Sequence, residues 1–380
     1  MITIRPGSRV QRLLFVLSIA GEFPIKSLHL LGQPRDLKKL IRRLEKVEEY
    51  RAHRTGPVIK TRLVIVSGKN PMRSIRLYKS ALHILNELHP EAFSYYMDAF
   101  GGHNFPGDIF HLQRNHRVSE VLAMCMMAGL EIRPYILPKL QKTSIQHIVP
   151  DFPCFYIARD FKKIDAAEMN KTQFTRIVGA LFYPSGVFAI YNTRDTVMKW
   201  SGMGEFKTAH YLLELTRMNA GLNDFPSAML LGNNPNIALQ TLIESDKSRR
   251  LEMRFDRIYQ HIHFIPLDQD GIRLMKILTT PDWNEKILSV LFTPEMRPAG
   301  YGFMEYDAYW NKTYIYSHLD SDIARLVRFK EALVTQEDQF EVLCYSWQTV
   351  FLEKYLGERV VIKQLEMDML EKSLGLNKCF

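Results

Sequence analysis

Hydrophobic residues recur at helical spacing along the first 50 positions, and the pattern predicts three helices there. The first spans Arg9 to Ala20 and ends before Gly21, where a helix stop is common. A short second helix is predicted from Pro24 to Leu31, and a third begins at Pro34, since proline suits the first helical turn. The apolar positions of the third helix share one face: Leu37, Leu40, Ile41, Leu44 and Val47. This helix should therefore bury its apolar face and expose the opposite one.

Two short runs rich in strand-forming residues follow the third helix. They span Arg62 to Val66 and Ser74 to Tyr78, and the residues Ser67 to Pro71 between them favour a turn. Another amphipathic helix, Lys79 to Leu88, closes this segment. Three helices, a hairpin and a trailing helix indicate a winged helix-turn-helix, in which the third helix enters the major groove and the hairpin follows the phosphates. We expect this domain to cover residues 1–88.

The remaining chain predicts a linker and then an α/β protein. Residues 89–110 are rich in aromatic residues, Gly and Pro, which favours a linker. We expect one α/β domain at 111–299 and an extension at 300–380 that either continues its sheet or forms a small third domain. The expected elements are a helix from His111 to Gly129, a hairpin of Arg176–Phe182 and Val187–Tyr191, helices at Glu205–Ala220 and Pro235–Glu244, and strands at Ala228–Leu231 and Ile258–Ile265. Their alternation predicts a mostly parallel or mixed sheet.

Charge is distributed unevenly along the chain. The first 80 positions hold 18 of the 50 Lys and Arg residues and only five acids, while the remaining 300 positions carry a small negative excess. This indicates a basic nucleic-acid-binding module joined to a near-neutral body. The cations that we expect to bind double-stranded DNA lie on the third helix and the hairpin: Arg35, Lys38, Lys39, Arg42, Arg43, Lys46, Lys69 and Arg73. Arg35, at the front of the helix, is suited to base edges.

Composition limits the class of protein further. The chain is 46% hydrophobic, which supplies enough apolar material for packed cores, and its 380 residues exceed the size at which single cores stop growing. Its four cysteines are scattered without a C-x-x-C pair, so neither a disulfide framework nor a zinc site is expected. The apolar run Leu13 to Ala20 is too short to span a membrane. We therefore expect a cytoplasmic protein with no membrane partner.

The predicted helix after the linker carries the pattern H-x-x-R-x-H-R-x-x-E: His111, Arg114, His116, Arg117 and Glu120. A basic winged helix followed by this motif and an α/β domain resembles the replication-relaxation family, which includes MobC-type plasmid mobilisation relaxases. The resemblance covers residues 5 to about 245. It implies a restriction-endonuclease-like fold of the PD-(D/E)XK kind, with Glu120 as the acidic residue of the first core helix. It also implies a role in mobilising or replicating mobile-element DNA together with other relaxosome proteins.

The catalytic pattern of such nucleases is incomplete in this chain. These enzymes hold Mg²⁺ with an Asp on one strand and an E-x-K on the next, because alternate strand residues face one side. The second strand of the predicted hairpin ends in Tyr191–Thr193 without an acid. The literal E-x-K is Glu205 to Lys207, ten residues after Asp195. It follows the glycines Gly202 and Gly204, which indicates the start of a helix instead of a strand. Candidate catalytic residues are Glu120, Asp195, Glu205 and Lys207, with Mg²⁺ expected only if this site is active.

Other polar residues suggest weaker candidates. His261 and His263 alternate on a predicted strand, and we interpret them as sheet residues instead of metal ligands. Trp200, beside Ser201 to Gly204, is read as a packing residue next to a loop. Tyr183, Tyr191 and Tyr211 are possible nucleophiles on a DNA phosphate, with nothing to favour any one of the three.

Three hypotheses follow from the sequence. The first is a DNA-binding protein of a mobile element whose nuclease-like domain nicks DNA or, in the reading we favour, keeps only a scaffold role. The second is a winged-helix transcriptional regulator whose α/β body senses a ligand or dimerises. The third is a winged-helix interaction protein that binds no DNA, since exposed charge runs are commonly just solvated faces.

Overall fold

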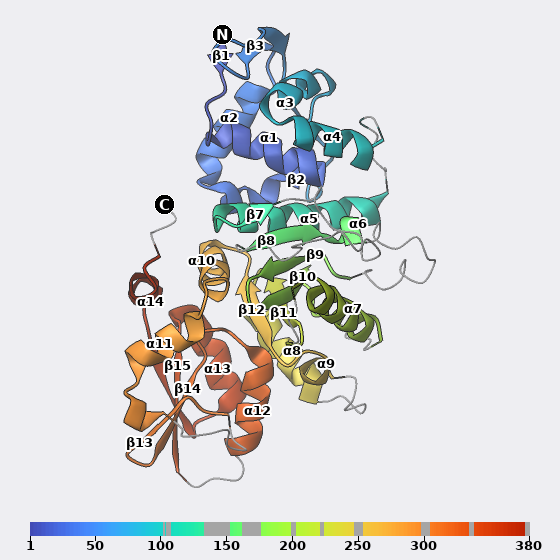
Figure 1. The fold of residues 1–380 in the computed structure, drawn as a ribbon. Helices are drawn as coiled ribbons and strands as arrows, with labels where there is room; N and C mark the ends of the chain where they lie inside the picture. The colour runs from blue at the N-terminus through green and yellow to red at the C-terminus, as the bar shows by residue number, and fades with distance from the viewer. Residues whose placement is uncertain are drawn as a thin grey trace. The chain divides into compact units, whose positions relative to one another are not determined.

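The structure is a computed structural model that forms two compact units (Figure 1). The first comprises Met1–Leu137 and Phe155–Asp160, and the second comprises Pro138–Cys154 and Phe161–Phe380. The residues described are 1–101, 103, 108–132, 153–161, 176–198, 203–220, 224–246, 254–297, 305–333 and 338–376. Both units mix helices with sheets, so the chain is an α+β protein of more than one compact unit. Of the predicted loop at Ser201 to Gly204, the first two residues and the neighbouring Trp200 lie outside the described residues, whereas Met203 and Gly204 are helical.

The first unit begins with the helices that the sequence predicts. Helix α1 spans Arg9–Ala20. Its N-cap Ser8 accepts a hydrogen bond from the Gln11 amide, and Gly21 follows its last residue with φ of 82°. The second predicted helix is a 3-10 helix, η1, over Ile25–Leu31, and α2 spans Pro34–Leu44. Helix α2 ends before Val47, which is exposed, so the buried stripe is shorter than the spacing predicted.

Two small three-stranded sheets also belong to this unit. Strands β5 (Val64–Ser67) and β6 (Ser74–Leu77) form the predicted antiparallel hairpin. Strand β2 (Glu22–Pro24), which lies between α1 and η1, pairs with β6, so the order is β2-β6-β5. The second sheet was not predicted. It contains β1 (Ile2–Thr3), β3 (Glu48–Arg51) and β4 (Ile59–Thr61) in the order β1-β3-β4.

The expected linker at 89–110 is largely helical, so this prediction was wrong for its first half. After η2 (Lys79–Ala81) and α3 (Leu82–Leu88), helix α4 spans Pro90–Ala99. It buries Tyr95 and Tyr96, because the aromatic residues that suggested a linker pack into the unit instead. Helix α5 (Ile109–Met127) contacts α1 and β2, so the first unit extends well beyond residue 88. The first unit also contains β7 (Glu131–Ile132), all but the first residue of β8 (Cys154–Ile157) and most of α6 (Ala158–Phe161).

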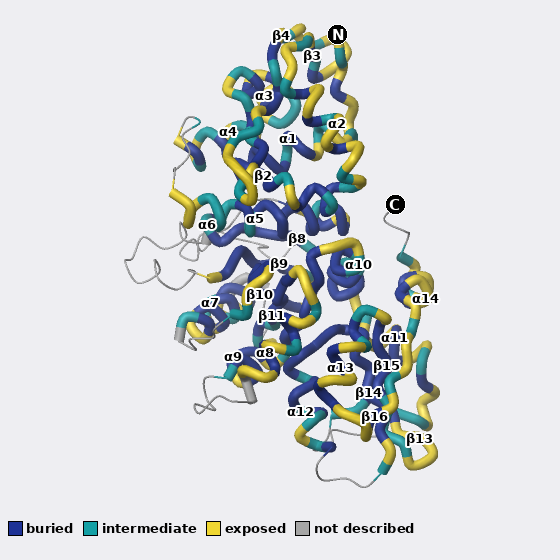
Figure 2. Tube along the Cα trace, turned by 180° about the vertical axis from the view of Figure 1, so that it is seen from behind, coloured by how far each residue is buried: buried dark blue, intermediate teal, exposed yellow. Residues whose placement is uncertain are grey.

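The second unit contains the predicted hairpin and alternating elements. Strands β9 (Gly179–Tyr183) and β10 (Gly186–Arg194) pair antiparallel, and β10, β11 (Ser227–Gly232) and β12 (Ile262–Pro266) run parallel to one another. All nine residues of β10 are buried, as expected for a central strand covered on both faces. Figure 2 shows mostly dark blue tube around β9, β10 and β11. The helices between them are α7 (Met203–Ala220), α8 (Asn236–Asp246) and α9 (Phe255–Ile258).

The last part of the chain forms a separate sheet within the second unit. Its order is β13-β14-β15-β16, in which the last three strands are parallel. The strands are β13 (Ala308–Trp310), β14 (Thr313–Ser317), β15 (Gln339–Cys344) and β16 (Val360–Gln364). The accompanying helices are α10 (Gln269–Leu278), α11 (Trp283–Leu291), η5 (Pro294–Met296), α12 (Ile323–Leu333), η6 (Ser346–Gln348), α13 (Thr349–Leu356) and α14 (Met367–Ser373). The C-terminal strands β13 to β16 therefore do not extend the sheet that contains β9 to β12.

Two expectations concern membranes and cysteines. Among the described residues, no helix is both long enough and apolar enough to cross a membrane. Cys125, Cys154 and Cys344 are buried free thiols, whereas Cys379 lies outside the described residues.

Candidate nucleic-acid interface and acidic sites

Helix α2 separates its apolar residues from its cations. Leu37, Ile41 and Leu44 are buried, whereas all six cations predicted on the helix are exposed. Lys46 lies two residues beyond the end of α2, so its placement on the helix was wrong. Arg43 lies 3.5 Å from a carboxylate oxygen of Glu48, and the other five cations have no ion-pair partner among the described residues. The Arg43 pair is exposed on the cation side and is worth at most about 1 kcal/mol. The helix therefore presents a row of cations to solvent.

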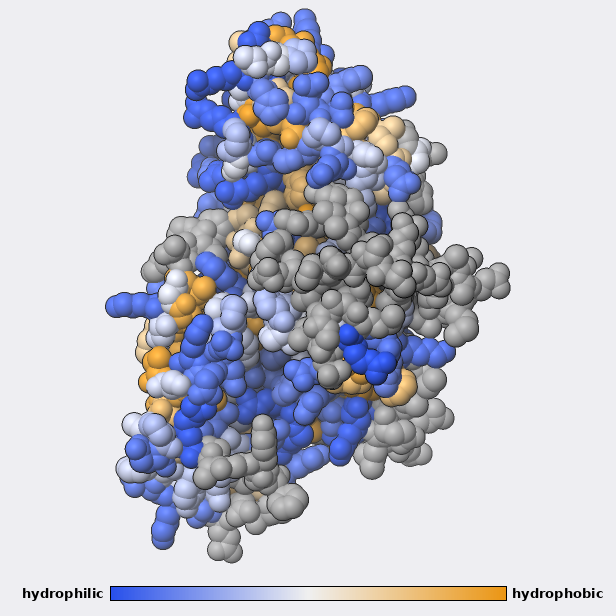
Figure 3. Space-filling model, in the orientation of Figure 1, coloured by the Kyte–Doolittle hydropathy of each residue, from blue (hydrophilic) through white to orange (hydrophobic). Residues whose placement is uncertain are grey.

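The turn between β5 and β6 presents two more cations. Lys69 and Arg73 are both exposed there. The Met72 amide donates to the Lys69 carbonyl at 2.8 Å, which closes the turn. Gly68 is required beside it, because its φ is 83° and an added Cβ would lie 3.0 Å from the Met72 carbonyl oxygen. Figure 3 shows hydrophilic residues gathered over the edge of the first unit where Figure 1 places α2.

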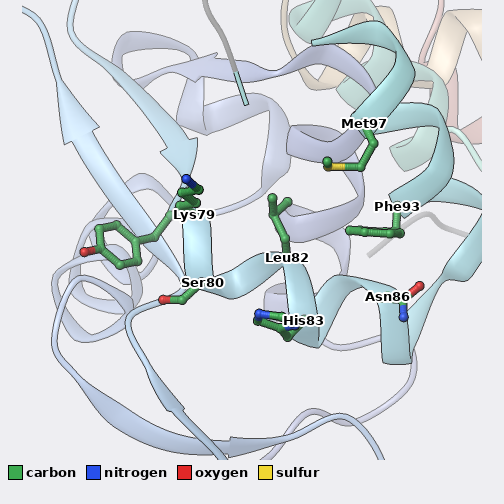
Figure 4. Close-up of a pocket in the computed structure, with 8 residues that line it drawn as sticks. Lys79, Ser80, Leu82, His83, Asn86, Phe93 and Met97 are labelled. Carbon is green, nitrogen blue, oxygen red and sulfur yellow. The ribbon is translucent and has the colours of Figure 1, made fainter. Parts of the chain in front are cut away.

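A cavity of about 540 Å³ lies between α3 and α4 (Figure 4). Leu82, Phe93 and Met97 point toward it and give it an apolar floor. The polar rim comes from Tyr78, Lys79, Ser80, His83 and Asn86. Sequence reasoning did not identify this cavity, because α4 falls in the segment that was expected to be a linker.

Behind the hairpin, the buried carboxylate of Glu22 is the centre of a polar network. It accepts hydrogen bonds from Ser74 Oγ at 3.0 Å, from Arg76 at 3.1 and 3.2 Å, and from Asn115 Nδ2 at 3.1 Å. His116 Nε2 lies 3.7 Å from the same carboxylate. Burial raises the pKa of Glu22, but the nearby His116 imidazole, the charge of Arg76 and the hydrogen bond from Asn115 outweigh it and lower the pKa below its usual value. Glu22 is therefore a charged residue inside the fold.

Glu120 lies on the same helix as His116, but the structure gives each residue its own partner. Glu120 is 2% exposed and accepts a hydrogen bond from Ser27 Oγ at 2.5 Å. His116 faces Glu22 of β2, as described above. The motif on α5 thus joins this helix to η1 and β2. These contacts give the motif a structural role within the first unit.

The other candidate catalytic residues lie in the second unit and do not share one face. Asp195 is exposed and accepts a hydrogen bond from Asn233 Nδ2 at 2.7 Å. Glu205 lies in the first turn of α7, is 2% exposed, and has its Oε1 3.1 Å from Arg176 Nη1. Lys207 is exposed on the same helix, since residues two apart on a helix point in different directions. Within the described ranges, no group of three or more His, Cys, Asp or Glu residues could hold a metal ion.

The predicted strand at Ile258–Ile265 was wrong for its first half, because Ile258 ends α9 and β12 begins at Ile262. His263 therefore lies on the strand and His261 directly before it, although the two rings still lie side by side. Their rings stack at 6.4 Å. His261 Nδ1 lies 2.7 Å from Asp322 Oδ2, and His263 Nδ1 lies 2.8 Å from the Asp320 carbonyl oxygen. Burial lowers the pKa of His261, but its hydrogen bond and charge pairing with Asp322 raise it above the usual value. Both histidines therefore bind the loop that follows β14.

That loop belongs to an acidic cluster that sequence reasoning missed. Asp322 accepts from the Ile262 and Ala324 amides at 2.9 Å, and Arg325 pairs with Asp307 at 2.9 Å and with Asp320 at 3.4 Å. Burial raises the pKa of Asp322, but the hydrogen bond from His261 contributes to a net lowering. The only local signal was the closely spaced trio Asp320, Asp322 and Arg325, which does not reveal contacts with β12.

Comparison with known proteins found no matching family model, no similar curated protein and no similar solved structure. The resemblance to the replication-relaxation family therefore rests on the sequence residues quoted above. It remains a hypothesis, and so do the winged-helix and endonuclease-like assignments.

Proposed function

We propose that this chain binds double-stranded DNA through a winged helix-turn-helix in its first unit. The order of elements supports the assignment: α1, β2, η1, α2, and then the hairpin β5–β6. Strand β2 pairs with β6, so the hairpin is joined to the strand between the first two helices. In this arrangement α2 is the recognition helix and the turn between β5 and β6 is the wing. The sheet β1-β3-β4 is an addition to this core.

The observation that carries the proposal is the exposure of all eight predicted cations, which lie on α2, directly after it at Lys46, and on the wing turn. A DNA interface needs cations that are available to phosphates, because each contact releases counterions from the duplex. A surface whose cations are neutralised by neighbouring carboxylates lacks this property. On α2 only Arg43 has a carboxylate partner among the described residues. Arg35 lies at the start of α2, where it is suited to reach base edges.

We further propose that the protein acts on mobile-element DNA as a binding component of a relaxosome, without nicking the DNA itself. The resemblance to the replication-relaxation family supports the biological setting. The non-catalytic role is favoured because Glu120 and Glu205 are both buried and each is hydrogen-bonded to a side chain of its own unit. A carboxylate that binds Mg²⁺ for DNA cleavage must instead direct its oxygens to the metal.

A second function, transcriptional regulation by a ligand-sensing body, is favoured by one observation in the second unit. His318 and Tyr345 bury side-chain polar atoms that have no hydrogen-bond partner among the described residues. Such atoms are costly unless something satisfies them, and a bound effector is one means. A regulator of this kind binds a palindromic site and leaves DNA intact without any metal.

The experiment that separates these roles uses supercoiled plasmid carrying the DNA adjacent to the protein's own gene. The full chain is incubated with Mg²⁺, Mn²⁺ or EDTA, and the gel is read for both a band shift and conversion to open circle. We expect a shift that does not depend on metal, with no open circle. Metal-dependent open circle that disappears in Glu120→Gln or Glu205→Gln would contradict the non-catalytic role.

A matched pair of variants tests the location of the interface. The triple variant Lys38→Ala, Lys39→Ala and Arg42→Ala removes three exposed cations from α2. The control Lys286→Ala, Lys354→Ala and Lys372→Ala removes three exposed cations from the second unit and changes net charge equally. We expect the first variant to lose at least tenfold in affinity for duplex DNA, and the control to lose less than twofold. Equal losses would show that net charge alone is responsible.

A further inference from the structure

Two loops of the second unit follow adjacent parallel strands and lie at the same edge of the sheet. Strand β14 leads into residues 318–322, and β15 leads into residues 345–348. Carboxyl ends of parallel strands are the usual place for ligands in α/β proteins. The loops are also tied together, because Gln348 Nε2 donates to the His318 carbonyl at 3.1 Å and Gln348 Oε1 accepts from the Tyr345 amide at 2.8 Å.

Four buried polar atoms on these two loops lack a hydrogen-bond partner among the described residues. They are His318 Nε2, Ser321 Oγ, Tyr345 Oη and Trp347 Nε1. His318, Ser321 and Tyr345 are each at most 2% exposed. Leaving a buried donor or acceptor unpaired is costly, and native proteins rarely do so repeatedly in one place. Ser321 also adopts a φ of 55°, a left-handed conformation that serine seldom takes.

The surroundings specify the charge of a suitable ligand. The loop after β14 contains the carboxylates of Asp320 and Asp322, and the guanidinium of Arg325 is shared between Asp320 and Asp307. An anionic ligand would be repelled. Burial lowers the pKa of His318 to about 4, so the imidazole is neutral at neutral pH. Asp307 and Asp320 already pair with Arg325, and Asp322 pairs with His261, so no carboxylate among them is left to hold a cation. A ligand that pairs with these atoms should therefore be uncharged.

The types of hydrogen-bonding group narrow the class further. Trp347 Nε1 only donates, whereas the hydroxyls of Ser321 and Tyr345 both donate and accept. The Tyr345 and Trp347 rings are nearly parallel, and their centroids are 6.3 Å apart. The Phe264 ring centroid is also 6.3 Å from that of Trp347. Hydroxyl groups on an uncharged ring match this combination, since each hydroxyl also both donates and accepts and the ring can lie against aromatic side chains.

We propose that the loops after β14 and β15 form a binding site for a small uncharged polyhydroxylated molecule of the monosaccharide class, held by His318, Ser321, Tyr345 and Trp347. His318, Ser321 and Tyr345 are each at most 2% exposed, so a ligand can reach them only if one of the loops moves. The proposal does not depend on DNA binding, because all four residues belong to the second unit.

The test measures thermal unfolding of the full chain after prolonged incubation with D-glucose, D-galactose or D-ribose, with uridine and inorganic phosphate as other arms. A ligand that binds the native state raises Tm. We expect at least one sugar to raise Tm and phosphate to have no effect. We also expect at least a tenfold loss of sugar affinity, measured by calorimetry, in Tyr345→Phe and Trp347→Phe. The control Tyr309→Phe alters an exposed tyrosine and should bind as the wild type does.

A second measurement compares the Tm of wild type and Tyr345→Phe in the absence of any ligand. If Tyr345 Oη is unpaired in the ligand-free protein, Tyr345→Phe leaves its Tm unchanged or raises it. A lower Tm in ligand-free Tyr345→Phe, with no Tm rise from any sugar, would show that interior water satisfies the hydroxyl and would overturn the proposal. A Tm rise from uridine alone, or one retained in both variants, would overturn it as well.

Discussion

Glu22 illustrates, at the scale of single residues, how this chain keeps a charge inside its fold. The carboxylate is 1% exposed and is held by Ser74, Arg76 and Asn115. Its partners come from β6 and α5, which are 52 to 93 residues away in sequence. Pattern reasoning correctly expected the cations of α2 to be exposed, because a helix with an apolar stripe must direct its charged residues outward. It did not find the Glu22 network, because no local pattern records contacts so distant.

Removing the Glu22 side chain should destabilise the protein strongly. Glu22→Ala leaves Arg76 and His116 without their carboxylate, and breaking a buried pair in this way costs about 3–5 kcal/mol. Because Arg76 is 24% exposed, we expect the lower end of that range. Urea denaturation measures the loss. The control Glu49→Ala alters an exposed acid and should change the free energy of unfolding by less than about 0.5 kcal/mol.

The lowered pKa of Glu22 also predicts a pH dependence. A carboxylate whose pKa is lower in the folded state than its ordinary value of 4.5 stabilises the fold fully above that pH, and the stabilisation is lost as pH falls through the folded-state pKa. The difference in unfolding free energy between wild type and Glu22→Gln should therefore shrink as pH falls from 6 to 3. A difference that stays constant or grows would contradict the assignment of Glu22 as charged.

At the scale of elements, the sequence predicted periodic helices and the hairpin better than short or aromatic segments. Helices α1 and α2 were expected because their apolar residues repeat at helical spacing. Helix α4 was missed because its neighbourhood combines aromatics with Gly and Pro, a composition that also describes loops. Strands β3 and β4 are only four and three residues long, too short for an alternating pattern to identify them.

The wing turn depends on one glycine, which makes its shape testable. Gly68→Ala adds a Cβ 3.0 Å from the Met72 carbonyl at a φ of 83°, and a non-glycine residue in that region costs about 1–3 kcal/mol. We expect this loss in urea denaturation, together with weaker DNA binding because Lys69 and Arg73 are displaced. Gly56→Ala is the matched control, since its Cβ would meet atoms no closer than 3.5 Å. If both variants bind DNA equally well, the wing does not contribute to the interface.

The buried polar atoms on the two loops of the second unit could not have been found from the sequence. Ser321 and Tyr345 are unremarkable as residue types, and their atoms become informative only when burial and missing partners are both known. The E-x-K motif of the nuclease-like pattern is visible in the sequence but does not form a site in the structure. Glu205 and Lys207 match E-x-K in sequence, but both lie on helix α7, where Glu205 is buried and Lys207 is exposed. The two side chains therefore point in different directions.

At the scale of the whole molecule, the uneven distribution of charge follows the division of the chain into two units. The cationic excess lies within the first 80 residues, which all belong to the first unit, whereas the second unit contains the acidic cluster around Arg325. This division is what a DNA-binding unit joined to a body with a different task requires. The third hypothesis, a winged-helix protein that binds no DNA, leaves the exposed cations without a role.

The salt dependence of DNA binding tests this central claim most directly. Fluorescence anisotropy with a labelled duplex gives Kd at several salt concentrations, and each phosphate contact contributes about 0.9 to the slope of log affinity against log salt. We predict a steep decline of wild-type affinity with salt, and a slope shallower by about 2–3 in the triple variant of Lys38, Lys39 and Arg42. Binding that is insensitive to salt, or a slope unchanged in that variant, would contradict the proposal that α2 contacts DNA.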